Sequence, residues 1–286
     1  MTTLSPPLPL RRLPVWRWAR AFTLLELLLV IAIIGMIAAI GIPAARNYNR
    51  GNLTGTASRQ LMDDLSQARY RAIGSRSEVY VVFIPYGLGT NYMAGLASAG
   101  IAPPPAGQIG AIVTNLLAGQ CRAYALFSPR TAGDQPGRGS ARYLTPWRTL
   151  PPGAFIATNK FSPASAGFAI AKLDPPVWVT PFGGRSEIEI PFPVADSRIL
   201  VKLPYVGFDY QGRLLGDGEE AIPLAQGAVD APRDANGRPK LPPNAQTSAF
   251  NAVAVESPLI NSVLQPNVIR VDWLTGRARF EKEEIR

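Results

Sequence analysis

The sequence has no histidine and only one cysteine, Cys121, and these shortages exclude several kinds of active site. A Ser-His-Asp triad and a Cys-His pair both need a histidine, so nucleophilic sites of these classes are excluded. Zinc sites built on histidine are excluded as well, and one cysteine cannot supply the sulfur-based alternatives. An intramolecular disulfide is impossible. Because Cys121 precedes a strand-like run, we expect a buried thiol rather than a reactive one.

Carboxylates remain as candidate catalytic or metal-binding groups, and two acid pairs stand out in the sequence. Neighbouring residues on a helix diverge in direction, so we expect Asp63 and Asp64 to lie on a solvated face. Residues 217–220, with Asp217, Glu219 and Glu220, offer oxygen ligands to calcium. The segment lacks the full spacing of a calcium loop, which favours an ordinary acidic turn. The sequence indicates no metal and no cofactor.

A long apolar run over residues 22–42 is the most informative feature that is present. A helix of this length covers about 30 Å, the thickness of the hydrocarbon core of a bilayer. The run contains one charged residue, Glu26, and an ionisable group inside a membrane helix is costly and usually functional. An ordinary signal peptide or a plain membrane anchor is the alternative, but the run is too long for a secretory signal and contains an acid, which such segments avoid. We therefore predict a transmembrane helix.

The residues before this run form a basic leader, residues 1–21. Arg11, Arg12, Arg17 and Arg20 contribute four positive charges to a formal net charge of +9, and the leader has no acid. Basic flanks stay on the cytoplasmic side of a membrane. We therefore predict a cytoplasmic N-terminus and an exported C-terminal domain.

The sequence RAFTLLE at residues 20–26, followed by the apolar run, resembles the class III signal of type IV pilins and type II secretion pseudopilins. Pro43 and Tyr48 also lie where helices of that family often carry Pro and Tyr, whereas Ala21 replaces the usual glycine. The resemblance implies that a prepilin peptidase cleaves between Ala21 and Phe22 and methylates the Phe22 amine. It further implies that Glu26 meets the N-terminal amine of a neighbouring subunit during assembly.

The remaining sequence predicts an α+β fold. A helical pattern resumes after Pro43 and gives one apolar stripe before Gly74 and Ser75 end the helix; the stripe consists of Leu61, Leu65, Ala68, Ala72 and Ile73. Beyond residue 77 the period changes to two, and strands are predicted near 79–83, 188–190, 199–203, 249–255 and 268–273. Proline-rich loops separate them, and residues 86–120 show no clear period. The expected domains are the leader (1–21), the N-terminal helix (22–75) and a β-rich exported domain (76–286). The resemblance implies a ladle, in which the long membrane-spanning helix packs on a mostly antiparallel sheet.

The function that the resemblance implies is that of a minor pilin or pseudopilin, and not that of an enzyme. Residues 64–73, 206–214 and 269–280 resemble the H-type minor pseudopilins, whereas long inserts at 86–150 and 215–250 depart from them. Such a subunit is anchored in the bacterial inner membrane and assembles by its helix, through Phe22, Glu26 and Pro43, into a type IV pilus or type II secretion pseudopilus. Its partners would be other pilins, the prepilin peptidase and an inner-membrane assembly platform.

Two other functions stay open. The sequence GRAR at residues 276–279 resembles the tail of FimT-like minor pilins implicated in DNA binding. Strand alternation would place Arg277 and Arg279 on one face, from which both guanidiniums could reach phosphates. A solvated hairpin is the simpler interpretation, because Glu281, Glu283 and Glu284 weaken the local positive field. A membrane-anchored enzyme would instead need two carboxylates that converge in a cleft.

Overall fold

The computed structural model describes residues 24–104, 109–130, 133–135, 139–162, 167–182, 186–216, 218–243 and 251–283, with the backbone alone over 40–52. The chain divides into two compact units, Met1–Tyr48 and Asn49–Arg286. The predicted leader and the Ala21–Phe22 junction lie outside the described residues.

One helix, α1 (Leu24–Ser75), begins in the first unit and ends in the second. Its backbone continues through Pro43, as the resumed helical pattern predicts. At its end the Ser75 hydroxyl donates a hydrogen bond to the Arg71 carbonyl, and Arg76 adopts a left-handed conformation with φ of 51°. This residue in left-handed geometry stops the helix where the sequence GS predicts its end.

Among its described residues, the second unit has two larger antiparallel sheets and a separate two-stranded one. The first sheet has the order β3-β2-β1-β9-β8, and β4 pairs with β2. Its strands are β1 (Val79–Phe83), β2 (Ala123–Ser128), β3 (Arg142–Tyr143), β4 (Arg148–Thr149), β8 (Glu187–Pro191) and β9 (Leu200–Phe208). The second sheet has the order β11-β10-β12-β13, and β5 pairs with β10. Its strands are β5 (Ala154–Ile156), β10 (Glu220–Asp230), β11 (Val253–Glu256), β12 (Asn267–Val271) and β13 (Ala278–Lys282).

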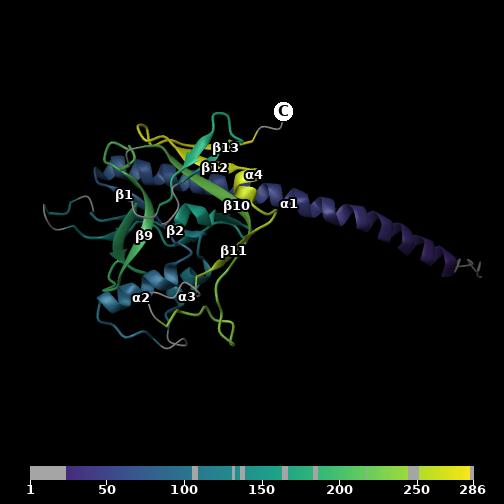
Figure 1. The fold of residues 1–286 in the computed structure, drawn as a ribbon, viewed down its shortest axis with the longest axis horizontal. Coiled ribbons are helices and arrows are strands. Elements are labelled where there is room, and N and C mark those ends of the chain that lie inside the picture. Colours follow the sequence, from purple (N-terminus) through teal and green to yellow (C-terminus); the bar gives the residue numbers. More distant parts are fainter. Residues whose placement is uncertain are drawn as a thin grey trace, which may run out of the picture. The chain divides into compact units, whose positions relative to one another are not determined.

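Both faces of the first sheet are covered, which the sequence did not predict. All five residues of β1 are buried: Val79, Val81 and Phe83 face α1. Tyr80 and Val82 face two short helices, α2 (Leu88–Ser98) and α3 (Ala111–Ala118). Figure 1 shows α2 and α3 on the side of this sheet opposite to the C-terminal part of α1. Helices α2 and α3, which come from the segment without a clear period, therefore form the second layer.

Smaller elements complete the second unit. A hairpin of β6 (Phe168–Ile170) and β7 (Val177–Val179) packs on the second sheet through residues such as Val177, Ala221 and Val268. A 3-10 helix, η1 (Thr158–Phe161), follows β5 in sequence, and a short helix, α4 (Asn261–Leu264), precedes β12. Arg270 lies two residues from Val268 on β12 and therefore shares the hairpin's face of the second sheet with its cross-strand partner Arg279.

The predicted apolar stripe of α1 is confirmed for four of its five residues. Leu61, Leu65, Ala68 and Ala72 are fully buried in a core that receives side chains from both sheets. Burial of each leucine contributes about 1.5–3 kcal/mol to stability. Ile73 is 39% exposed and was assigned wrongly; it lies beside the turn at Gly212 instead. The predicted mixed α and β class with antiparallel sheets is confirmed.

Candidate functional site

The N-terminal part of α1 is apolar on all its sides. Over residues 24–37 every side chain is exposed, and the large apolar ones range from 42% exposure at Val30 to 81% at Leu24. Glu26 lies among them and is exposed too. A helix without a polar face needs a partner that covers it all round, either lipid or other helices.

Within the described part of the chain, no helix is long and apolar enough to cross a membrane. The transmembrane helix over residues 22–42 therefore stays a prediction. Cleavage and methylation at Ala21 and Phe22 also stay predictions, since both residues lie outside the described part. Pro43 lies within α1, where only the backbone is described.

A buried carboxylate fixes the C-terminal part of α1 to the first sheet. Asp64 is only 4% exposed, so its predicted place on a solvated face is wrong, whereas Asp63 is exposed as expected. The Tyr124 hydroxyl donates to Asp64 Oδ2 at 2.5 Å, and Arg148 forms an ion pair with Oδ1. Gln60 Nε2 donates to the Tyr124 oxygen at 2.8 Å. The pKa of Tyr124 is raised, mainly by burial and next by the hydrogen bond to Asp64. The hydroxyl therefore stays protonated and acts as the donor.

We expect Asp64→Asn to destabilise the second unit by about 1–3 kcal/mol, because it removes the charge that Tyr124 and Arg148 share. The cost stays in this range because the Arg148 side chain is 38% exposed and can be hydrated. Asp63→Asn is the matched control and should change stability by less than about 0.5 kcal/mol. Thermal unfolding of the full chain in detergent, followed by near-ultraviolet circular dichroism, measures both. Equal midpoints for the two variants would contradict the assigned role of Asp64.

Four charged side chains gather on the face of the second sheet beside the β6–β7 hairpin, and we call Glu219, Arg270, Arg279 and Glu281 the charged cluster. Arg270 and Arg279 are direct cross-strand partners, which by themselves would repel. Arg270 Nε donates to Glu219 Oε2 at 2.6 Å, and Arg279 Nε lies 2.9 Å from Glu281 Oε1. Desolvation acts to lower the pKa of Arg270, but its bonds to Glu219 and Glu281 outweigh it and raise that pKa. The cluster is neutral overall.

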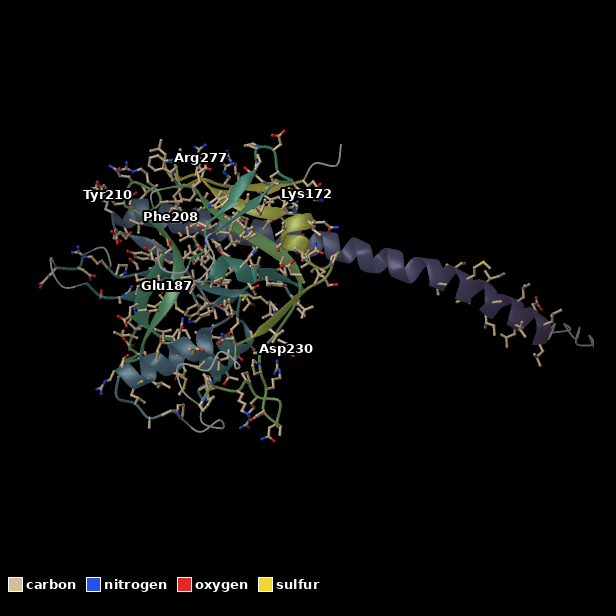
Figure 2. All side chains as sticks on the ribbon, viewed as in Figure 1. Lys172, Glu187, Phe208, Tyr210, Asp230 and Arg277 are labelled. Carbon is tan, nitrogen blue, oxygen red and sulfur yellow. The ribbon has the colours of Figure 1, made fainter. Side chains whose placement is uncertain are left out.

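Of the candidate DNA-binding arginines, Arg277 lies in the turn between β12 and β13, and Arg279 lies on β13. Arg277 and Arg279 are exposed, whereas Ala278 and Phe280 are partly buried against the core. Figure 2 shows Arg277 and Lys172 along the upper side of the second unit. Arg279 is already paired with Glu281 and lies 3.8 Å from Glu219. This compensation reduces the positive field that phosphates would meet, and DNA binding stays a prediction.

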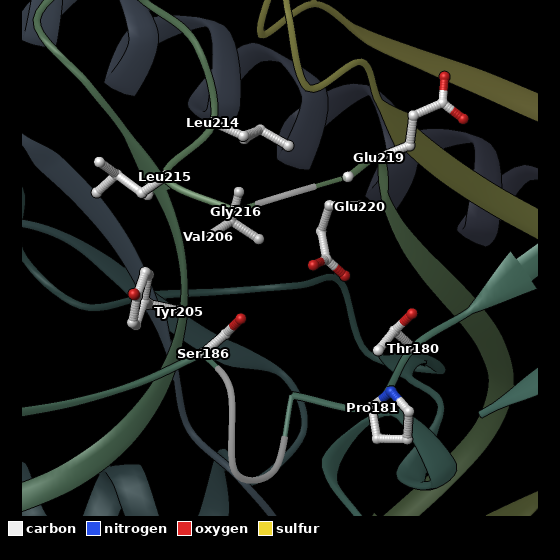
Figure 3. Close-up of a pocket in the computed structure, with 12 residues that line it drawn as sticks. Thr180, Pro181, Ser186, Tyr205, Val206, Leu214, Leu215, Gly216, Glu219 and Glu220 are labelled. Atoms are coloured by element: carbon white, nitrogen blue, oxygen red, sulfur yellow. The ribbon is translucent and has the colours of Figure 1, made fainter. Parts of the chain in front are cut away.

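Glu219 and Glu220 do not converge. They line a pocket of about 500 Å³, and Figure 3 shows their carboxylates pointing to opposite sides. Glu220 forms an ion pair with Lys160, which is completely buried. The Lys160 ammonium also donates a hydrogen bond to the Thr180 carbonyl and lies 4.3 Å from the centre of the Phe182 ring. Among the described residues, no group of three or more Cys, Asp or Glu side chains could hold a metal ion. Both acids therefore have ion-pair roles that the sequence missed.

Cys121 is buried, as predicted. Its side chain is 1% exposed, and burial raises the pKa of the thiol to about 12. The residue adopts a left-handed conformation with φ of 59° immediately before β2. At neutral pH the thiol is therefore protonated and inert.

Comparison with known proteins gives a partial relationship. Over 86 residues the chain is 36% identical to a protein named type IV major pilin protein PilE1 from Neisseria gonorrhoeae. The aligned segment makes up 30% of this chain and 44% of that relative. A second PilE1 sequence from that organism matches at the same identity over 40% of its length. The chain thus spans less than half of the length of these curated relatives. No family model matches the chain, and no solved structure matches it significantly. Over this segment the chain is related to the type IV pilins.

Proposed function

We propose that the protein is a filament subunit of the type IV pilus or type II secretion pseudopilus kind, anchored by the N-terminal part of α1. The observation that carries the proposal is the helix itself. It is apolar all round over residues 24–37 with a single acid, Glu26, and the same helix continues into the core of the second unit. The similarity to type IV pilins supports this function.

Before assembly, lipid would cover the apolar part of α1, and in a filament the helices of neighbouring subunits would replace it. Glu26 bears on this exchange, because an ionisable group on a membrane helix is costly and usually functional. In the filament, the Phe22 amine of a neighbouring subunit would lie against its carboxylate. Such a pair would also fix the axial position of one subunit against the next.

This proposal includes processing by a prepilin peptidase at Ala21–Phe22, an inner-membrane platform as partner and a location at the inner membrane before assembly. The role is structural rather than catalytic. The acids of the second unit support this view, because Asp64, Glu219 and Glu220 are each held in ion pairs by cationic side chains. Carboxylates paired in this way stabilise the fold and are poorly placed for acid-base work.

The test is mass spectrometry of filaments sheared from cells that express the chain. We expect the chain among the filament proteins, beginning at Phe22 and one methyl group heavier than the unmodified peptide. Cells without prepilin peptidase are the control and should retain residues 1–21 on the chain, with none of it in filaments. A chain that starts elsewhere, or that never enters filaments, would contradict the proposal.

A further inference from the structure

A second recess lies between the β6–β7 hairpin and the second sheet, and two tryptophans line it. Trp178 on β7 is 58% exposed and Trp273 after β12 is 46% exposed. The recess has a volume of about 370 Å³ and is also lined by Arg270 and Glu219. We call it the tryptophan recess. We propose that it binds a neutral carbohydrate, with the pyranose faces stacked on the two indoles.

Local structure constrains both tryptophans: the Trp178 ring has a close neighbour, and Trp273 lies in a hydrogen-bonded backbone turn. A side chain at Gly167 would place its Cβ 2.8 Å from Trp178 Nε1, so the glycine leaves the space that this ring fills. Gly167 also has φ of 84°, which favours glycine. Trp273 lies in a turn in which Asp272 Oδ1 accepts bonds from the Thr275 amide and hydroxyl at 2.6 and 2.7 Å. A pre-positioned aromatic face loses little entropy when a ligand stacks on it.

The polar groups of the recess select a ligand that both donates and accepts hydrogen bonds. Glu219 is an acceptor and Arg270 is a donor, and their mutual bond holds both in place. Sugar hydroxyls satisfy both kinds of group. A proline-rich peptide offers mainly carbonyl acceptors and would leave the Glu219 carboxylate without a new donor.

The charge of the recess argues against an ionic ligand. Arg270 and Arg279 are balanced by Glu219 and Glu281, so the surrounding field favours neither a phosphate nor a cation. The C–H groups of a pyranose carry partial positive charge and suit the negative face of an indole. The volume falls within the range of small-ligand sites. The adjoining pocket of about 500 Å³ shares Thr180, Gly218 and Glu219 and gives room for further sugar units.

The experiment uses the full chain in a zwitterionic detergent without a sugar headgroup. Cellotriose, maltotriose and the trimer of N-acetylglucosamine are titrated by calorimetry and by intrinsic tryptophan fluorescence. We expect saturable binding of at least one trisaccharide, with an affinity unchanged between low and high salt. Trp178→Ala and Trp273→Ala should each weaken it about tenfold.

Tyr210→Ala is the matched control, because Tyr210 is 57% exposed and lies outside the lining of both pockets. It should leave the affinity unchanged, and near-ultraviolet circular dichroism verifies that all variants are folded. Absence of trisaccharide binding overturns the proposal. Three other results also overturn it: binding of a proline decapeptide in place of any sugar, a steep loss of affinity with salt, or an affinity in either tryptophan variant equal to that of the unchanged chain. Because no filament is needed, the result is independent of the proposed function.

Discussion

Glu220→Gln is expected to destabilise the second unit by about 3–5 kcal/mol, because it leaves the fully buried ammonium of Lys160 without its counter-charge. Burial already acts to lower the pKa of Lys160, and Glu220 opposes this effect. Lys160→Met is expected to cost much less. Glu220 is 18% exposed and can be hydrated, while methionine fills the apolar space beside Phe182.

The double variant Lys160→Met/Glu220→Gln separates the pair from simple loss of a side chain. It should recover most of the stability that Glu220→Gln loses, because the buried charge is removed together with its partner. Glu219→Gln is the adjacent control; Arg270 keeps Glu281, so we expect a loss of at most about 1 kcal/mol. Chemical denaturation of the full chain in detergent gives the four free energies. A double variant no more stable than Glu220→Gln would refute the ion-pair account.

Glu26→Gln is expected to abolish co-purification with other pilins while cleavage at Phe22 and membrane insertion continue. Removing the charge lowers the free-energy cost of placing the helix in lipid, so the defect must arise when subunits dock. If Glu26 pairs with the amine of a neighbouring subunit as proposed, loss of one partner from that ion pair in an apolar setting costs about 3–5 kcal/mol at each such contact.

Affinity purification of the chain from membranes, with quantification of the other pilins, measures this effect. Glu26→Asp keeps the charge and should retain much of the association, whereas Glu26→Ala should behave like Glu26→Gln. If Glu26→Gln co-purifies and forms filaments normally, Glu26 has no part in docking. If Glu26→Asp fails as completely as Glu26→Gln, side-chain length rather than charge decides the contact.

The sequence predicted the parts of the fold in which periodicity and burial agree. The stripe from Leu61 to Ala72 is read correctly because one face of α1 is buried and the other is polar. Helices α2 and α3 were missed because their sequences contain no comparable polar stripe. Gly95 also argues against a helix interior, yet there it allows α2 to approach β9, where a Cβ would lie 2.3 Å from the Leu200 carbonyl oxygen.

The candidate sites were harder to predict because their residues are distant in sequence. Asp64 meets Arg148, 84 residues further along, and no local pattern marks that pairing. Glu219 and Glu220 suggested joint action, but successive residues at the start of a strand point to opposite faces. Trp178 and Trp273 lie on separate hairpins, and only the packing of β6–β7 on the second sheet brings them into one recess.

The position of α1 within the second unit has a mechanical consequence. A pull that reaches residue 57 along the helix acts on Leu61, Leu65, Ala68 and Ala72 together, since all four are buried in one core to which both sheets contribute. Withdrawing the helix would remove these side chains from that core and would also break the Asp64 network, so the load is shared among several contacts. A subunit drawn out of a membrane by this helix would therefore carry its second unit with it in the folded state.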